Sequence, residues 1–582
     1  MTESTSKPAP EFTSSNPAAA FAELNRMLFA GAAGKLDAGQ TTPDMAQMMQ
    51  LLTAGIATDS ERWLELNNRY YREHLALWQA CANPAAQGAT PLPPPTDRRF
   101  RAAEWREPYY NYLAHSYLLS ARWLEEMTAA AKLDAHAKHK LEFYTKQMID
   151  ALSPANYPWT NPEAIKLAAE TDGASIQQGL KNLAADIDKG LVSMTDETAF
   201  EVGRNLAITP GAVVYENDFM QLLQYAPLTG EVYERPLVMV PPCINKYYIL
   251  DLQPDNSYVR HAVAAGHTVF MVSWRNMPAE MGHVTWDDYL EHGVMRALTV
   301  AQDISGTAQV NALGFCVGGT LLACALAVLR ARGEDPVASA TFLTTMLDFS
   351  DTGELSVFID EPYVAAREAE FAQGGVLKGR ELALTFASLR ANDLIWPYVV
   401  NNYLKGRTPE AFDLLYWNSD STNLPGTMYK YYVRHTYLEN NLRTPGKLTM
   451  CGVPVDLANV DMPAYLLAAR EDHIVPWRTA YGSVPLLGGP LQFVLAASGH
   501  IAGVVNPAIR NKRNFWTNDT LPPEAEAWLE SATSQPGSWW PHWTDWLAQY
   551  GGARVAALAA PGNARYPAIE PAPGRYVKDK LR

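Results

Sequence analysis

A glycine-flanked cysteine at 314–319 is the sequence feature that most restricts the fold of this chain. The run reads Gly-Phe-Cys-Val-Gly-Gly, with Cys316 third. An apolar stretch rich in β-formers ends at 315, and a helical pattern covers 320–332. In so sharp a turn, side chains two positions away would collide with the central residue, so only glycine fits at 314 and 318. The pattern predicts a nucleophile elbow with cysteine where serine is usual.

The surrounding sequence predicts the sheet that such an elbow needs. Short apolar runs at 236–242, 267–274, 309–315, 462–469 and 491–497 alternate with helical stretches such as 286–304 and 320–332. Strands that alternate with helices form a mainly parallel sheet covered on both faces. The alternation stops between about 351 and 450, so we expect an insertion there that caps the site at the strand ends.

The first part of the chain has a different pattern. Residues 1–20 are rich in Ser, Thr, Pro and Ala, which predicts disorder. Helical spacing begins near 43 and resumes through 109–127 and 136–152, without a convincing strand up to about 195. We therefore expect a helical N-terminal domain over 1–195 and a catalytic α/β domain over 196–582.

Composition limits the classes of function. A net charge of −15 makes a general nucleic-acid binder a poor candidate, because such proteins need a basic surface. Five cysteines in 582 residues do not suit a disulfide scaffold and predict reduced thiols in the cytosol. The first residues lack a secretory signal, and apolar runs of about ten residues are too short to span a membrane.

Two later loops supply partners for Cys316 in the chain order nucleophile, acid, base. Asp472 follows the predicted strand 462–469, and His500 follows the strand 491–497 in a Gly-rich loop. All three residues thus lie just beyond the carboxyl end of a strand. His473 is a rival base, but adjacent side chains usually point apart, so we favour His500.

The oxyanion of such a reaction needs two backbone donors. We expect the N–H of Val317 to be one and the N–H of Cys243 or Ile244, in the loop after 236–242, to be the other. Cys243 has no elbow and is interpreted as a buried thiol. The chain has no C-x-x-C pair, H-E-x-x-H helix, P-loop or G-x-G-x-x-G run, so neither a metal nor a nucleotide cofactor is expected.

A cysteine nucleophile suits thioester substrates, because acyl transfer between sulfurs is nearly thermoneutral and leaves a reactive acyl group. The residues alone therefore predict a cysteine acyltransferase or hydrolase with a cap.

Eight blocks of sequence make the chain resemble a class I polyhydroxyalkanoate synthase, a family with the α/β-hydrolase fold. They are GFCVGGT at 314–320, PPCINKYYILDL at 241–252, SWRNM at 273–277, LRANDLIW at 389–396, YWNSDSTNLPGTMY at 416–429, YLENNL at 437–442, REDHIVPW at 470–477 and SGHIAGVVNP at 498–507.

The resemblance implies that Cys316, Asp472 and His500 form the catalytic triad. It implies short (R)-3-hydroxyacyl-CoA substrates, CoA as a product, no further cofactor, and a polyester product. It also implies a homodimer on the surface of cytoplasmic storage granules. Arg275 and Arg390 lie in matched blocks and are weak candidates for the CoA phosphates, with structural ion pairs as the alternative. Ala502 is a candidate for the border of the acyl channel.

Two other functions remain open. A cysteine thioesterase or esterase would share the elbow and the triad but would not explain the helical domain and the large cap. A non-catalytic granule-coat protein would use the tryptophans at 539, 540, 543 and 546 for surface binding, although these are more often part of a packed helix.

Overall fold

The computed structural model describes residue 53, residues 59–82 and residues 93–580. The described residues form two compact units, one within Met1–Asp196 and Leu384–Glu410 and the other within Glu197–Ala383 and Ala411–Arg582. We call them the helical unit and the sheet unit. The expected disorder of 1–20 lies outside the described residues, as does most of the first part of the helical pattern that begins near 43; its continuation through 63–66 lies in the helix Ser60–Ala82.

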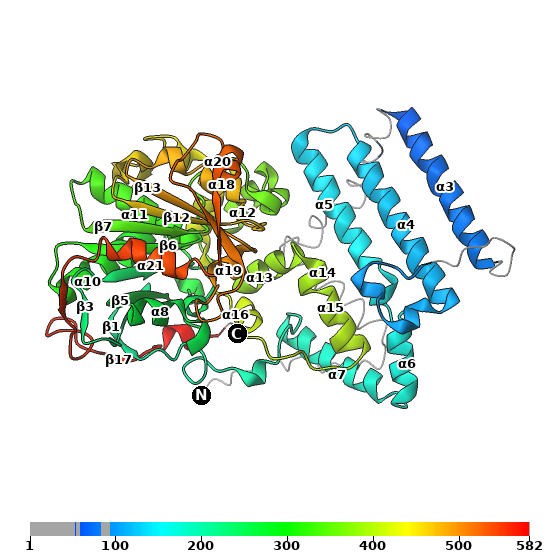
Figure 1. Cartoon of the computed structure of the whole chain (residues 1–582), viewed down its shortest axis with the longest axis horizontal. Helices are drawn as coiled ribbons and strands as arrows, with labels where there is room; N and C mark the ends of the chain where they lie inside the picture. Colours follow the sequence, from blue (N-terminus) through cyan, green and yellow to red (C-terminus); the bar gives the residue numbers. More distant parts are fainter. Residues whose placement is uncertain (1–52, 54–58, 83–92, 581–582) are drawn as a thin grey trace, which may run out of the picture. The chain divides into compact units, whose positions relative to one another are not determined.

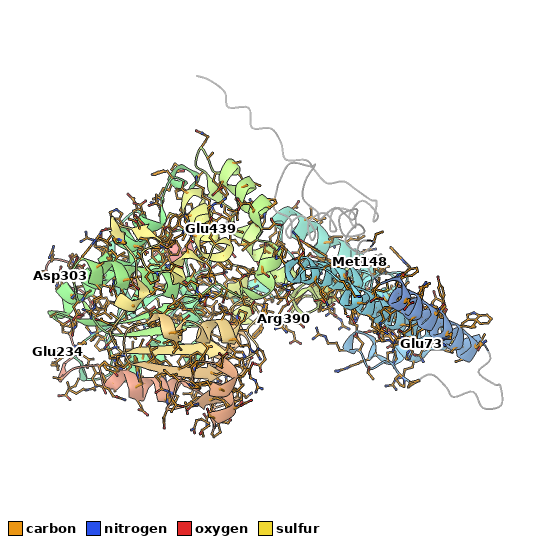
Figure 2. The ribbon with its side chains drawn as sticks, turned by 90° about the horizontal axis from the view of Figure 1, so that it is seen from above. Glu73, Met148, Glu234, Asp303, Arg390 and Glu439 are labelled. Atoms are coloured by element: carbon orange, nitrogen blue, oxygen red, sulfur yellow. The ribbon has the colours of Figure 1, made fainter. Side chains whose placement is uncertain are left out.

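The helical unit consists of helices in the part of the chain that is described, without a strand (Figure 1). Its helices are α3 (Ser60–Ala82), α4 (Pro108–Ala130), α5 (Ala135–Ala151), α6 (Pro162–Glu170) and α7 (Ala174–Lys189). The helices α4 and α5 confirm those expected at 109–127 and 136–152. Side chains of these helices can be followed in Figure 2 from Glu73 to Met148.

The helical unit also contains a segment from much later in the chain. Residues 384–410 form the end of α13 (Gly379–Ser388), α14 (Ala391–Leu394), α15 (Trp396–Tyr398) and the π-helix Val399–Leu404. Their apolar side chains share one core with helix α7 and the residues after it, made of Leu183, Val192, Ala387, Ala391, Ile395, Trp396, Val399 and Tyr403. The predicted division differs here, because it assigned this segment to the cap.

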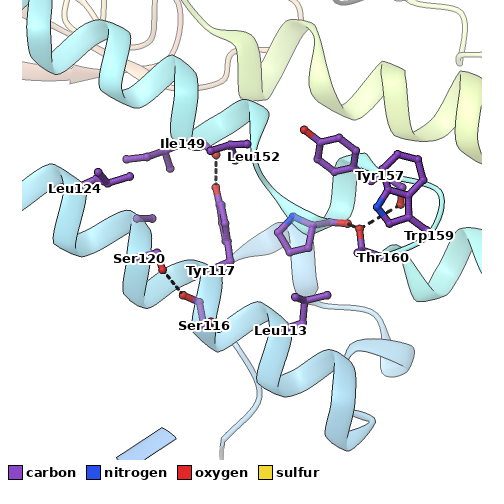
Figure 3. A pocket seen from close by; sticks show the side chains of 12 residues that line it. Leu113, Ser116, Tyr117, Ser120, Leu124, Ile149, Leu152, Tyr157, Trp159 and Thr160 are labelled. Atoms are coloured by element: carbon purple, nitrogen blue, oxygen red, sulfur yellow. Dashed lines mark hydrogen bonds between the residues drawn. The ribbon is translucent and has the colours of Figure 1, made fainter. Parts of the chain in front are cut away.

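A mostly apolar cavity of about 380 Å³ lies in the helical unit between α4, the end of α5 and the loop that follows it (Figure 3). The side chain of Tyr117 extends from α4 towards α5, where its hydroxyl donates to the carbonyl of Ile149 at 2.8 Å. This bond ties the two helices together beside the cavity.

The sheet unit is built on an eleven-stranded sheet in the order β15-β14-β13-β12-β7-β6-β4-β5-β2-β1-β17. The six strands from β13 to β5 are parallel, and the strands outside them pair antiparallel. The parallel strands are β4 (Leu237–Val240), β5 (Val269–Trp274), β6 (Val310–Phe315), β7 (Val337–Leu343), β12 (Ala464–Ala469) and β13 (Leu491–Ala496). Five of them confirm predicted strands, whereas β7 was not predicted.

The outer strands were also not predicted. They are β1 (Gly211–Glu216), β2 (Met220–Tyr225), β14 (Asn514–Thr517), β15 (Thr533–Pro536) and β17 (Glu570–Pro571).

Alternate residues of the parallel strands contribute to two cores. In β4, Val238 and Val240 belong to the core that contains α10 (Arg296–Ser305) and α11 (Val317–Ala331). Leu237 and Met239 belong to the core that contains α8 (Tyr258–Ala264) and α21 (Trp540–Ala548). A sheet that is buried on both faces accounts for the continuous apolar runs of its strands.

The C-terminal tryptophans form part of a packed helix rather than a surface for binding. Trp539, Trp540 and Trp543 are each at most 2% exposed. The indoles of Trp539 and Trp540 donate to the carbonyls of Gly503 and Val504, both at 2.9 Å. These bonds fix the short helix α19 (His500–Val504) against the body of the unit.

Candidate active site

Cys316 occupies a strained turn between β6 and α11. Its backbone has φ 54° and ψ −128°, a conformation that costs free energy for a residue with a Cβ. The surrounding structure holds it there: the Cys316 N–H donates to the carbonyl of Leu343 in β7 at 2.9 Å. The thiol is half-buried. This geometry is the elbow that the Gly-x-Cys-x-Gly pattern predicts.

The glycines around Cys316 have no room for a side chain. A Cβ on Gly314 would lie 2.3 Å from the Cα of Gly319, and one on Gly318 would lie 2.3 Å from the carbonyl oxygen of Val240. A Cβ on Gly319 would lie 2.0 Å from the hydroxyl oxygen of Thr345. Backbone atoms therefore leave room only for glycine at the two predicted positions, and the Thr345 side chain crowds position 319 as well.

Asp472 and His500 come together at the ends of adjacent parallel strands. The loops after β12 and β13 are joined by the N–H of Glu471, which donates to the carbonyl of Ser498 at 3.0 Å. The imidazole Nδ1 of His500 lies 2.7 Å from one carboxylate oxygen of Asp472. The other oxygen accepts the backbone N–H groups of Ile474 and Val475 at 2.8 and 2.9 Å. Both carboxylate oxygens thus have partners, and the side chain is fixed facing His500.

The electrostatics connect Cys316 to this pair. Burial lowers the pKa of the His500 imidazole. The charges of the Asp472 carboxylate and the Cys316 thiolate, with hydrogen bonds to both, outweigh burial and raise the pKa to about 10. His500 also stacks on Phe315, the residue before the elbow, with ring centroids 5.7 Å apart. The structure therefore brings together the three residues that the sequence selected, and it joins Asp472 to His500 rather than to its neighbour His473.

The residues expected to supply the oxyanion donors belong to the start of α11 and to the loop after β4. Val317 is the first residue of α11, where backbone N–H groups have no partner within the helix. The loop after β4 packs against the same turn, because the missing Cβ of Gly318 would meet the carbonyl oxygen of Pro241 at 2.5 Å. Cys243 and Ile244 follow in this loop.

Cys243 is a buried thiol, as its sequence context indicates. It is 1% exposed, and burial is the main cause that raises its pKa to about 12, with a smaller contribution from the charge of Cys316. A thiol with so high a pKa is a poor nucleophile near neutral pH.

The three candidates for substrate binding are two arginines that form ion pairs and an alanine in a short helix. The guanidinium of Arg275 lies 3.4 Å from the carboxylate of Asp218, and that of Arg390 lies 3.1 Å from Asp393. Arg390, labelled in Figure 2, belongs to the helical unit. Both arginines therefore have the ion-pair partners that the alternative interpretation expects. Ala502 is half-buried in α19, and its carbonyl accepts a hydrogen bond from Arg513.

The sequence reasoning missed two tyrosines of the cap. Burial is the main cause that raises the pKa of both Tyr432 and Tyr437, and the charge of Cys316 contributes to both increases. Their ring centroids are 5.5 Å apart in an edge-to-face contact. Tyr437 opens the sequence block 437–442, which was noted only as a resemblance.

The residues that the structure describes contain neither a candidate metal site nor a candidate membrane-spanning helix. They contain no group of three or more His, Cys, Asp or Glu side chains that could hold a metal ion. None of the helices among them is both long and apolar enough to cross a membrane.

Comparison with known proteins places the chain in a family. The family model described as "Poly-beta-hydroxybutyrate polymerase (PhaC) N-terminus" matches residues 96–262, and that of the alpha/beta hydrolase fold matches residues 236–507. The chain is 57% identical over 533 residues to the "Poly(3-hydroxyalkanoate) polymerase subunit PhaC" of Cupriavidus necator, covering 90% of each chain. The chain belongs to the polyhydroxyalkanoate synthase family.

A second relative of this synthase is the "Poly(3-hydroxyalkanoate) polymerase" of Methylorubrum extorquens, 42% identical over 93% of this chain and 91% of that protein. Among solved structures, a monoacylglycerol lipase of Paleococcus ferrophilus is 12% identical with a TM-score of 0.32, covering 57% of this chain and 99% of that one. The match of residues 236–507 to the alpha/beta hydrolase family model, together with the mainly parallel sheet, confirms the α/β-hydrolase fold that the sequence resemblance implied.

Proposed function

We propose that this synthase polymerises (R)-3-hydroxyacyl units from their CoA thioesters, with short acyl groups such as 3-hydroxybutyryl as substrates and CoA as the released product. The single observation that carries the proposal is the joining of Asp472 to His500 beside an elbow cysteine. Membership of a family whose relatives are named poly(3-hydroxyalkanoate) polymerases supports it.

The first half of the reaction acylates Cys316. His500 holds the proton of the Cys316 thiol as an imidazolium, in keeping with its raised pKa of about 10, and the thiolate attacks the thioester carbonyl carbon. The Val317 N–H and one N–H of the 243–244 loop stabilise the negative charge on the carbonyl oxygen. When the carbonyl re-forms, the bond to the CoA sulfur breaks, and the imidazolium of His500 returns the proton to that sulfur. The products are CoA and a 3-hydroxyacyl-cysteine.

The second half forms the ester bond. His500 takes the proton from the hydroxyl of another 3-hydroxyacyl unit, whose oxygen attacks the acyl carbon on Cys316. The carbon–sulfur bond breaks, and the proton on His500 returns to the Cys316 sulfur. Asp472 orients the imidazole and stabilises its charged form in both halves. Each round lengthens the polyester by one unit.

Cys316→Ala tests this scheme. We expect the variant to release no CoA from 3-hydroxybutyryl-CoA, because it has no sulfur to acylate. Cys451→Ala is a matched control, since Cys451 is also half-buried and also has a positive φ, 50°. Undiminished CoA release by Cys316→Ala would rule the scheme out.

A cysteine thioesterase is the second candidate, because the same triad would hydrolyse the acyl-cysteine if water reached it. The product of incubation with 3-hydroxybutyryl-CoA separates the two. Turbid polymer supports the synthase reaction, and free 3-hydroxybutyrate supports the hydrolase.

We extend the proposal to a homodimer that works on the surface of polyester granules in the cytoplasm. Light scattering of the purified protein with and without substrate tests the dimer, and fluorescence microscopy of a tagged protein in polymer-producing cells tests the location. A monomer, or diffuse fluorescence around stained granules, would contradict this extension.

A further inference from the structure

The loop after β4 is held at both ends, and different parts of the chain hold the two ends. At its start, the indole N–H of Trp274 in β5 donates to the carbonyl of Pro241 at 2.9 Å. At its end, residues 417–422 of the predicted cap hold residues 244–246. We call 417–422 the strap.

Three contacts join the strap to the end of the loop. The N–H of Thr422 donates to the carbonyl of Ile244 at 2.7 Å. Ser421 pairs with Asn245 as an antiparallel bridge, and the Asn245 amide donates to the Ser421 hydroxyl at 3.3 Å. The indole N–H of Trp417 donates to the carbonyl of Lys246 at 2.7 Å. The strap thus forms hydrogen bonds with three consecutive loop residues.

The strap is buried where it makes these contacts. Trp417, Ser421 and Thr422 are 4%, 1% and 2% exposed. Outside the loop, Asp420 accepts the phenol O–H of Tyr248 at 2.9 Å. Buried hydrogen bonds of this kind are costly to break, because water does not replace the lost partners. The strap therefore contributes to holding the end of the loop in this conformation.

The N–H groups of Cys243 and Ile244 lie between the two fixed ends. Only the peptide units 242–243 and 243–244, which carry these N–H groups, lie between the held carbonyls of Pro241 and Ile244, so short-range chain connectivity restricts how far they can rotate. An oxyanion donor is effective only when it is already aimed at the position of the developing charge.

We propose that the strap positions the second oxyanion donor, so that acyl transfer at Cys316 requires the strap to be docked on the loop. The proposal rests on the proposed function and adds positioning residues to it. Trp417 and Tyr248 are the positioning residues that side-chain substitution can test. Movement of the cap that lifts the strap would switch off the oxyanion site without disturbing the triad.

Trp417→Phe is the main test, because it keeps an aromatic ring and removes the N–H that holds the Lys246 carbonyl. Trp543→Phe is the matched control, since Trp543 is also buried and its indole donates to the Thr341 hydroxyl at 3.1 Å, in the core of the sheet. Tyr248→Phe is a milder second variant that removes the bond to Asp420 and leaves the loop carbonyls untouched.

Two rates are measured for each variant. CoA release from 3-hydroxybutyryl-CoA needs the oxyanion donors, whereas alkylation of Cys316 by iodoacetamide, followed by mass spectrometry, forms no oxyanion. We expect Trp417→Phe to lower kcat for CoA release about tenfold or more, with alkylation within about twofold of wild type. The ratio of the rate of CoA release to the rate of alkylation therefore falls in Trp417→Phe. It should fall by a smaller factor in Tyr248→Phe and should not change in Trp543→Phe.

Unchanged CoA release by Trp417→Phe, or an equal fall in both rates, would overturn the proposal. If Trp417→Phe does not fold, Tyr248→Phe decides the outcome by the same ratio. If the wild-type protein releases no CoA, the proposed function fails instead, and the ratio is then measured with the hydrolysis of a simple acyl thioester.

Discussion

Gly318→Ala should damage the active site severely, although it adds only one methyl group. The new Cβ would lie 2.3 Å from the carbonyl oxygen of Val240 and 2.5 Å from that of Pro241. Unstrained contacts are about 3.5 Å, so the structure must open by about 1 Å. Both oxygens are backbone atoms at the end of β4, which is paired on both sides within the sheet, so the elbow must move instead.

A displacement of about 1 Å at a reacting centre costs on the order of 100-fold in rate. We therefore expect kcat for CoA release from 3-hydroxybutyryl-CoA to fall about 100-fold. The free energy of unfolding should fall by about 1–3 kcal/mol, the usual cost of overpacking. The assay follows the loss of thioester absorbance, with urea unfolding measured in parallel.

Gly230→Ala is the matched control, because its Cβ would meet nothing within 4 Å. It should keep both the wild-type rate and the wild-type stability. A Gly318→Ala protein that releases CoA at the wild-type rate with unchanged stability would refute the argument that packing at the end of β4 fixes the elbow.

Two further predictions concern pH and the second cysteine. The pKa of His500 is about 10 in the folded protein against an ordinary value of 6.5, so its ion pair with Asp472 stabilises the fold fully below pH 6.5 and is lost as the pH rises towards 10. Asp472→Asn should therefore make the fall in the free energy of unfolding over that range shallower, by up to about 1.4 kcal/mol per pH unit. Equal slopes in urea unfolding of wild type and variant at pH 6.5 to 10 would contradict this. Cys243→Ala should keep CoA release within about threefold of wild type, because the buried Cys243 thiol has a pKa of about 12 and does not serve as a nucleophile. Complete loss of CoA release in a folded Cys243→Ala protein would show that this thiol has a role in the chemistry.

The triad could be predicted from the sequence because each member has a local signal. Cys316 has its glycines, and Asp472 and His500 each follow a recognisable apolar strand in the expected order. Tyr432 and Tyr437 have no such signal. The sequence of a helical segment does not show whether a tyrosine in it is exposed to solvent or buried, because the tertiary packing of the cap determines its environment.

The strand β7 shows a second limit. Its sequence, Val-Ala-Ser-Ala-Thr-Phe-Leu, contains two polar residues that are fully buried. The hydroxyl of Ser339 donates to the side-chain oxygen of Asn311, and the hydroxyl of Thr341 accepts the indole N–H of Trp543. Partners far away in the sequence make these polar side chains acceptable inside the sheet. The apolar pattern along the chain therefore did not predict this strand.

The return of residues 384–410 to the helical unit has a consequence for the order in which the chain folds. Leu183 and Val192 leave the ribosome about 200 residues before Val399 and Tyr403, with which they share a core. At roughly 5–20 residues per second, that delay is on the order of 10–40 s. During this time the N-terminal helices present an unfilled apolar surface. We expect them to complete their fold only after most of the parallel sheet has been synthesised, in contrast to the usual N-to-C order of domain folding.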